Sequence, residues 1–115
     1  MLLTKKDILS HDDLKSEVVD VPEWGGSVKV STMSAFSRDR FEASITKIGG
    51  GMNMNNIRAK LAIATLVDDD NQPMFDEKDI EALGKKSCAA LDRVFEAAQR
   101  LNLISDKEVE TLAKK

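Results

Sequence analysis

The sequence has few of the residues that usually build catalytic, metal and disulfide sites. Its 115 residues include one cysteine, one histidine, one tryptophan, four phenylalanines and no tyrosine. A single cysteine, Cys88, cannot form an internal disulfide, which indicates a reducing compartment. A single histidine, His11, has no second histidine with which to complete a metal site. We therefore predict neither a metal nor any other cofactor.

The chain also lacks an excess of positive charge and any long apolar run. Its formal net charge is −3, whereas binding to a nucleic-acid backbone requires a basic surface that releases counterions. No segment approaches the ~18 apolar residues of a membrane-spanning helix, and the first ten residues lack the apolar core of a signal peptide. These absences predict a cytosolic protein that binds neither nucleic acid nor membranes.

The residues that are present are typical of one small domain over residues 1–115. A chain of this length buries roughly two thirds of its unfolded surface, which is enough for a core without disulfides or metal. That core must come from Leu, Ile, Val, Ala and Met, which suit helices better than sandwiches. We predict the α+β class, mainly α-helical, with an N-terminal β-hairpin packed on a small helical domain.

Residues 1–17 have the pattern of a short helix with little to bury. Thr4 and Asp7 have the spacing of a capping box at its start. Its apolar content is small and consists of Leu3, Ile8 and Leu14. We expect this segment to be loosely attached or to fold against a partner.

Residues 18–33 carry the clearest strand pattern. β-branched residues lie on both sides of a turn in which Pro22 presets φ, while Gly25 and Gly26 tolerate positive φ. Because two strands alone are marginal in water, this hairpin must pack on helices. Trp24, in the turn, is the natural anchor.

Residues 34–113 predict helices throughout. Ser34 and Asp76 have the character of N-caps. The run from Leu61 to Val67 contains a single polar residue, so we expect a central helix that is buried on both faces. The strongest apolar stripe, at 88–101, consists of Cys88, Leu91, Val94, Phe95, Ala98 and Leu101. Two pairs of opposite charge at i, i+4 should form on exposed faces: Arg38 with Glu42, and Glu96 with Arg100.

Several local patterns resemble ligand sites but lack an essential residue. The acids from Asp68 onward cannot form an EF-hand, because Pro73 occupies the sixth position, where the loop needs glycine. Glycines 49–51 lack the spacing of a phosphate-binding loop. His11 reads as a surface residue, and Cys88 as a buried, inert thiol with no histidine partner. We therefore predict that the protein is not an enzyme.

Three residues are candidates for binding a partner. Trp24 either pins the hairpin to the helices or anchors an interface, since tryptophan at a turn serves both purposes. Met52 and Met54 flank a glycine run and either fill gaps in the core or form an adaptable contact surface. The sequence leaves both alternatives open.

The order of four segments resembles the tail assembly chaperones of long-tailed, siphovirus-type bacteriophages. The resemblance covers roughly residues 18 to 104. Its motifs are V-P-E-W-G-G-S-V-K-V (21–30), S-A-F-S-R-D-R-F-E-A (34–43), N-I-R-A-K-L-A-I-A-T-L-V-D-D-D-N-Q-P-M-F (56–75) and D-I-E-A-L-G-K-K-S-C-A-A-L-D-R-V-F-E-A-A-Q-R-L-N (79–102). This family often has glycine where Asn71 stands, but asparagine also tolerates positive φ.

The resemblance implies a non-enzymatic protein of the host bacterial cytoplasm that is absent from the mature virion. Such a chaperone coats and solubilises the tape measure protein and helps to recruit tail tube subunits, in several copies that associate as a homo-oligomer. Its gene often yields a longer product through a ribosomal frameshift, for which the codons of 113–115 are a suitable place. The alternatives are a small cytosolic adaptor for another partner and, more remotely, a small enzyme or ligand-binding protein.

Overall fold

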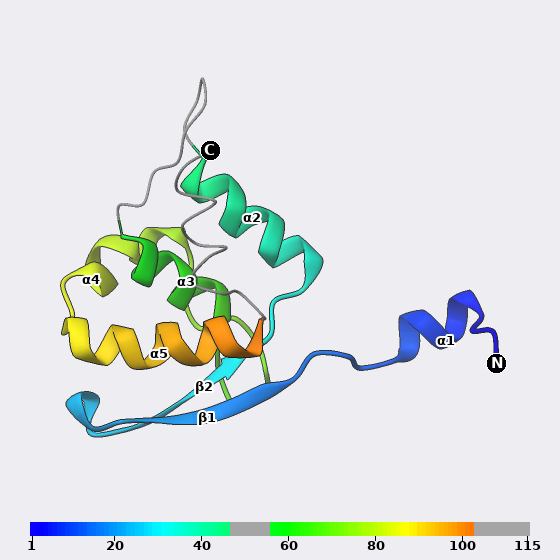
Figure 1. Cartoon of the computed structure of the whole chain (residues 1–115), viewed down its shortest axis with the longest axis horizontal. Coiled ribbons are helices and arrows are strands. Elements are labelled where there is room, and N and C mark those ends of the chain that lie inside the picture. The colour runs from blue at the N-terminus through cyan, green and yellow to red at the C-terminus, as the bar shows by residue number, and fades with distance from the viewer. Residues whose placement is uncertain (47–55, 103–115) are drawn as a thin grey trace.

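A computed structural model describes residues 1–46 and 56–102 of the chain (Figure 1). Three antiparallel strands form a sheet in the order β1-β2-β3. α5 packs on β1 and β2, α3 packs on α5, and α2 packs on α3. The elements are α1 (Lys5–Ser10), β1 (Ser16–Val21), the 3-10 turn η1 (Pro22–Trp24), β2 (Gly26–Ser31), α2 (Ala35–Ile45), α3 (Ile57–Thr65), β3 (Leu66–Val67), the 3-10 turn η2 (Glu77–Asp79), α4 (Ile80–Gly84) and α5 (Cys88–Leu101).

The predicted hairpin is confirmed, as is the mainly helical α+β class. β1 pairs with β2 from Ser16 opposite Ser31 to Val21 opposite Gly26. Between the strands, η1 ends at Gly25, whose φ of +75° lies in the left-handed region that glycine tolerates. The Gly25 N–H donates to the carbonyl of Pro22 at 3.0 Å, which closes the turn.

The third strand was not predicted from the sequence. The predicted helix through Val67 was wrong for its last two residues, because α3 ends at Thr65, where the hydroxyl donates back to the Leu61 carbonyl at 2.8 Å. The backbone then becomes extended, and Leu66 pairs with Val30 of β2. The edge of β2 offers backbone hydrogen bonds that a further helical turn would leave without partners. A two-residue strand therefore replaces the end of the expected helix.

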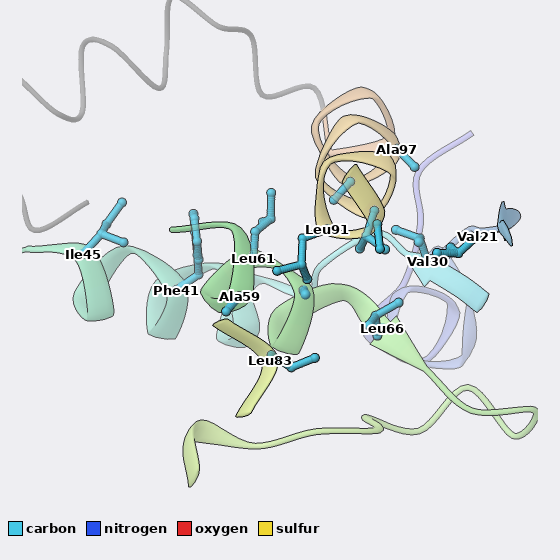
Figure 2. Packing of buried hydrophobic residues seen from close by; sticks show 14 residues of the cluster. Val21, Val30, Phe41, Ile45, Ala59, Leu61, Leu66, Leu83, Leu91 and Ala97 are labelled. Atoms are coloured by element: carbon cyan, nitrogen blue, oxygen red, sulfur yellow. The ribbon is translucent and has the colours of Figure 1, made fainter. Parts of the chain in front are cut away.

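The core extends from the sheet into the spaces between the helices (Figure 2). Leu61 of α3 lies near its centre and is 1% exposed. Three alanines on the buried side of α5 let its backbone approach its neighbours closely. The cluster consists of Val21, Val30, Phe41, Ile45, Ala59, Leu61, Ala62, Leu66, Leu83, Ala90, Leu91, Val94, Ala97 and Ala98.

The predicted burial of Cys88 was wrong. Cys88 is the first residue of α5 and is exposed, with its Sγ 3.6 Å from an Asp92 carboxylate oxygen. The buried face of α5 is centred near Leu91 and Val94 and includes Ala90 and Ala97, which the predicted stripe omitted. At about 100° per residue, Cys88 lies roughly a third of a turn from that centre.

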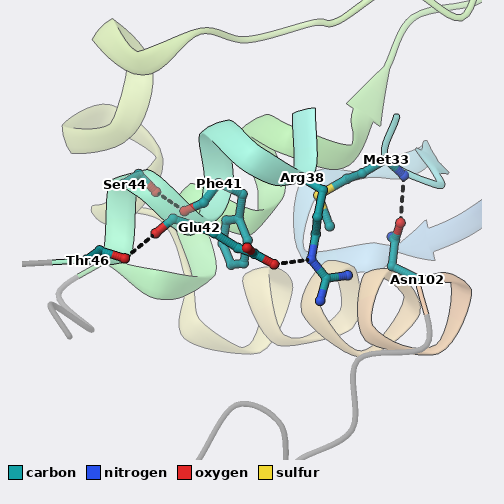
Figure 3. Close-up of polar contacts among 7 residues, drawn as sticks. All are labelled: Met33, Arg38, Phe41, Glu42, Ser44, Thr46 and Asn102. Carbon is teal, nitrogen blue, oxygen red and sulfur yellow. Dashed lines mark hydrogen bonds and ion pairs between the residues drawn. The ribbon is translucent and has the colours of Figure 1, made fainter. Parts of the chain in front are cut away.

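Polar contacts stabilise both ends of α2. At its C-terminal end, the Thr46 hydroxyl donates to the Glu42 carbonyl at 2.8 Å (Figure 3). Ser34 is the predicted N-cap, and its hydroxyl accepts from the Ser37 N–H. The predicted Arg38–Glu42 ion pair is present at 2.9 Å. Beyond α5, the Asn102 side chain accepts from the Met33 N–H at 2.6 Å and donates to the Ala98 carbonyl at 2.9 Å. Asn102 therefore ties the end of α5 to the loop between β2 and α2.

The short helix predicted within residues 1–17 is present as α1, and it stands away from the body of the molecule (Figure 1). Its predicted capping box is confirmed: the Thr4 N–H donates to the Asp7 carboxylate at 3.0 Å, and the Asp7 N–H donates to the Thr4 hydroxyl at 3.2 Å. The Thr4 N–H lowers the pKa of Asp7 below its ordinary value. Every residue from 1 to 16 is exposed, so local capping defines α1 without support from a core.

Candidate interaction surfaces

Trp24 lies at the turn of the hairpin and faces the helical body. It is half-buried and packs against the core cluster. Its turn, η1, contacts α5, so Trp24 takes the position expected of an anchor between hairpin and helices. Part of the ring remains accessible, and its role in binding a partner stays a prediction.

Two ion pairs bind β1 and its turn to α5. Arg93 contacts Glu23 through two hydrogen bonds, from Nε at 2.9 Å and from Nη2 at 3.2 Å. Arg100 contacts Glu17 at 2.8 Å. The predicted Glu96–Arg100 pair was therefore wrong, because β1 passes close enough for Arg100 to reach a carboxylate on another element. Sequence spacing gives no signal for such pairs between distant segments.

The Glu23–Arg93 contact predicts a pH dependence of stability. The Arg93 guanidinium donates to the Glu23 carboxylate and lowers its pKa below the ordinary value. The contribution is therefore complete above the unfolded-state pKa of about 4.3 and is lost as the pH falls through the lower, folded-state value. In urea titrations, wild type should exceed Glu23→Gln in unfolding free energy at pH 7, and this difference should shrink by pH 3. The exposed Glu81→Gln serves as the control, and a difference independent of pH would contradict the assignment.

A groove lies between α2, the C-terminal half of α3, β3 and the segment that follows β3. Its volume is about 740 Å³, within the range of sites that hold a ligand of several hundred daltons. The apolar lining includes Phe36, Phe41, Ile63, Ala64, Phe75 and Ile80. The expected burial of α3 on both faces is wrong at Ile63 and Ala64, which are only partly buried and line this groove. The apolar run from Leu61 to Val67 was the one sign of the groove in the sequence, but its pattern predicted core residues.

Charged side chains border the groove. Arg40 lies over the Phe36 ring at 5.7 Å and forms an ion pair with Glu77 at 2.8 Å. The Lys60 ammonium group donates to the Ser44 carbonyl at 3.0 Å. Its positive charge stabilises the C-terminal end of α2, because the last carbonyl groups of a helix carry partial negative charge. Asp76 lies beside Glu77 on the same border. The groove thus combines an apolar floor with an acidic side formed by η2 and its N-cap.

The remaining predicted sites are the methionine pair, the glycine run, His11 and the acidic turn. Met52, Met54 and glycines 49–51 lie outside the described residues. His11 is exposed, as predicted. In the acidic turn, the Asp68 carboxylate accepts the N–H groups of Asp70 at 2.9 Å and Gln72 at 3.1 Å, so it shapes the turn. Asn71 adopts the positive φ that its place in the turn requires, at +63°.

Within 1–46 and 56–102, no three Asp, Glu, His or Cys side chains come together in a way that could hold a metal ion. No helix in the part of the chain that the structure describes is long and apolar enough to cross a membrane.

Comparison with known proteins identifies the family. The family model described as phage tail assembly chaperone matches residues 5–115, so the match extends further toward the N-terminus than the resemblance in the sequence motifs. The solved structure of the tail assembly chaperone of bacteriophage HK97 has the same fold, with a TM-score of 0.61 and 23% identity over 88% of this chain and 95% of that one. None of the curated proteins matches this chain. The match over nearly the whole sequence places the chain in the phage tail assembly chaperone family.

Proposed function

We propose that this chaperone binds the tape measure protein and keeps it soluble during tail assembly, without catalysing a reaction. In this proposal it acts in the cytoplasm of the host bacterium, is absent from the mature virion, and works in several copies that associate. A longer product of a ribosomal frameshift near Ala113 recruits tail tube subunits.

The observation that carries the proposal is the amount of apolar surface exposed by a small acidic protein of this family. Leu2, Leu9 and Phe36 are 96%, 74% and 70% exposed. The groove, whose lining includes Phe36, adds a concave apolar surface. Soluble monomers rarely expose apolar side chains in contiguous groups unless another molecule covers them. A protein that must cover long apolar helices while remaining dispersed needs such surfaces together with a net charge away from zero.

The client surface proposed here includes the accessible part of Trp24, with Met52 and Met54 as further contacts. Tryptophan and methionine are both enriched at protein interfaces, where the first supplies rigid apolar area and the second adapts its shape. Trp24 belongs to the turn η1, which contacts α5, and the groove residues do not include it. Trp24 therefore adds a client contact outside the groove.

Co-expression with the tape measure protein of the same phage tests the proposal. The tape measure protein alone should sediment with the insoluble fraction, and co-expression should move most of it into the supernatant as a complex that a tag on the chaperone recovers. An acidic protein of similar size, expressed at the same level, is the control. A tape measure protein that stays in the pellet beside correctly folded chaperone would refute the proposed client.

A further inference from the structure

We propose that the ion pair between Arg40 and Glu77 is a strap that closes the mouth of the groove and opens when the two side chains separate. This inference goes beyond the proposed function, because it concerns access to the groove and assigns no molecule to it. Binding of the tape measure protein can therefore stand or fail independently of the strap.

The strap joins two walls that stand on a common floor. α2 and η2 both pack on α3, and α3 contributes Ile63 and Ala64 to the groove lining. Arg40 lines the groove from α2, and Glu77 lines it from η2. The Arg40 Nη2 atom is 2.8 Å from the Glu77 Oε1 atom. The pair therefore reaches from one wall to the other above the apolar floor.

The Arg40 side chain also covers apolar surface at the mouth of the groove. Its guanidinium group lies 5.7 Å from the centre of the Phe36 ring, one turn earlier on α2. A helical side chain leans toward the preceding turn, and a cation over an aromatic ring is weakly attracted to it. Glu77 holds the guanidinium group in this position from the other wall. When that contact breaks, Arg40 can turn toward solvent and uncover the ring.

The other charged residues of the lining are engaged elsewhere. The Asp76 carboxylate caps η2, and the Lys60 ammonium group donates to the Ser44 carbonyl at 3.0 Å. Each of these groups is thus held on its own side of the groove. Arg40 and Glu77 remain as the opposite charges that face each other across it.

The strap is weak enough to open readily. The side chains of Arg40 and Glu77 are 58% and 62% exposed. Exposed ion pairs are only slightly more stable than their separated partners, and exposed side chains change rotamer rapidly. Salt at about 1 M shortens the Debye length to about 3 Å and screens such a pair. Access to the groove should therefore increase with ionic strength, although the floor of the groove is apolar.

Opening the strap leaves both walls in place. The hydrogen bonds that close η2 join Asp76 and Asp79 and do not involve the Glu77 side chain. On the other wall, Arg40 lies within α2, whose first turn is capped by Ser34. Substitution of either member of the pair should therefore change access to the groove and preserve the fold.

The labelling rate of a cysteine on the groove floor tests the strap. In a full-length Cys88→Ser background, Ala64→Cys places a small thiol on the floor, and an uncharged maleimide measures its accessibility at low salt. Glu77→Gln should raise the labelling rate about two- to fivefold, and about 1 M salt should bring the parent to the same rate. Glu42→Gln removes the same charge from an ion pair on α2 that lies outside the groove, with Arg38. This control should leave the rate unchanged.

Arg40→Gln separates opening of the strap from an electrostatic effect on the thiol. Loss of a nearby negative charge by itself lowers the pKa of a thiol and speeds labelling, whereas loss of a nearby positive charge slows it. Arg40→Gln should instead speed labelling as Glu77→Gln does. The double variant should be no faster than either single variant, because both substitutions remove the same contact. Opposite effects of the two single variants, or a rate that neither changes, would overturn the proposal.

Discussion

Replacing Leu61 by alanine is expected to lower the free energy of unfolding by about 3 kcal/mol, the largest effect of any single truncation considered for this chain. Leu61 is 1% exposed at the centre of α3, and α3 packs against both α5 and α2. Removal of three heavy atoms loses their transfer free energy and leaves a cavity that two packed helices cannot easily close. Urea denaturation followed by circular dichroism at 222 nm measures the change, with an unaltered m-value as the sign that the unfolded state is the same.

Ile63→Ala provides the matched control on the same helix. Ile63 is two residues further along α3 and lines the groove, where it is only partly buried. Its truncation removes apolar atoms of the same size from a position that solvent reaches, so about 1 kcal/mol or less is expected. Equal losses for the two variants would show that α3 does not have one side in the core and one side in the groove.

Replacing Trp24 by alanine is expected to lower the free energy of unfolding by about 2 kcal/mol. A fully buried tryptophan would lose roughly 3–5 kcal/mol, and Trp24 is half-buried against the core cluster. The substitution should destabilise the whole hairpin, because two strands that do not pack on an apolar surface are marginally stable in water. Thermal melting and urea titration both measure it, and Trp24→Phe, which keeps an aromatic ring, should recover more than half of the lost stability.

The same two variants separate the two roles predicted for Trp24. A melting temperature that Trp24→Ala leaves unchanged would contradict the anchor role. If, in addition, the variant no longer recovers the tape measure protein, Trp24 belongs to the client surface alone. If both stability and recovery fall while Trp24→Phe restores only stability, the indole ring serves both roles.

The parts of the fold that depend on neighbouring residues were predictable from the sequence. The capping box of Thr4 and Asp7, the Ser34 N-cap and the hairpin around Pro22 all depend on contacts within a few residues, and all are present. β3 was not predictable in this way, because Leu66 becomes a strand residue only when β2 lies beside it. Local patterns specify local hydrogen bonds, and the missed strand depends on a contact across 36 residues of sequence.

The candidate surfaces were less accessible to sequence analysis. Ile63 and Ala64 looked like core, because an apolar run does not reveal that one of its sides meets a groove. Cys88 looked buried because a helical stripe drawn from apolar character alone passed over the small alanines at positions 90 and 97. Trp24 was identified as the anchor of the hairpin, but its ion-paired neighbour Glu23 was not, since Arg93 lies 70 residues away. These errors share one cause, namely that burial depends on elements that come together only in the folded chain.

The hydrogen bonds of Asn102 bear on how one gene could make two interchangeable subunits. Asn102 joins α5 to Met33 and completes the described body of the protein, so a ribosome has already supplied every residue of that body before it reaches the codon for Ala113. A change of reading frame near that codon would give two polypeptides with the same body. If the protein works in several copies, as proposed, the longer polypeptide could take the place of any shorter one. The frequency of the frameshift would then set how many tube-recruiting extensions each assembly carries.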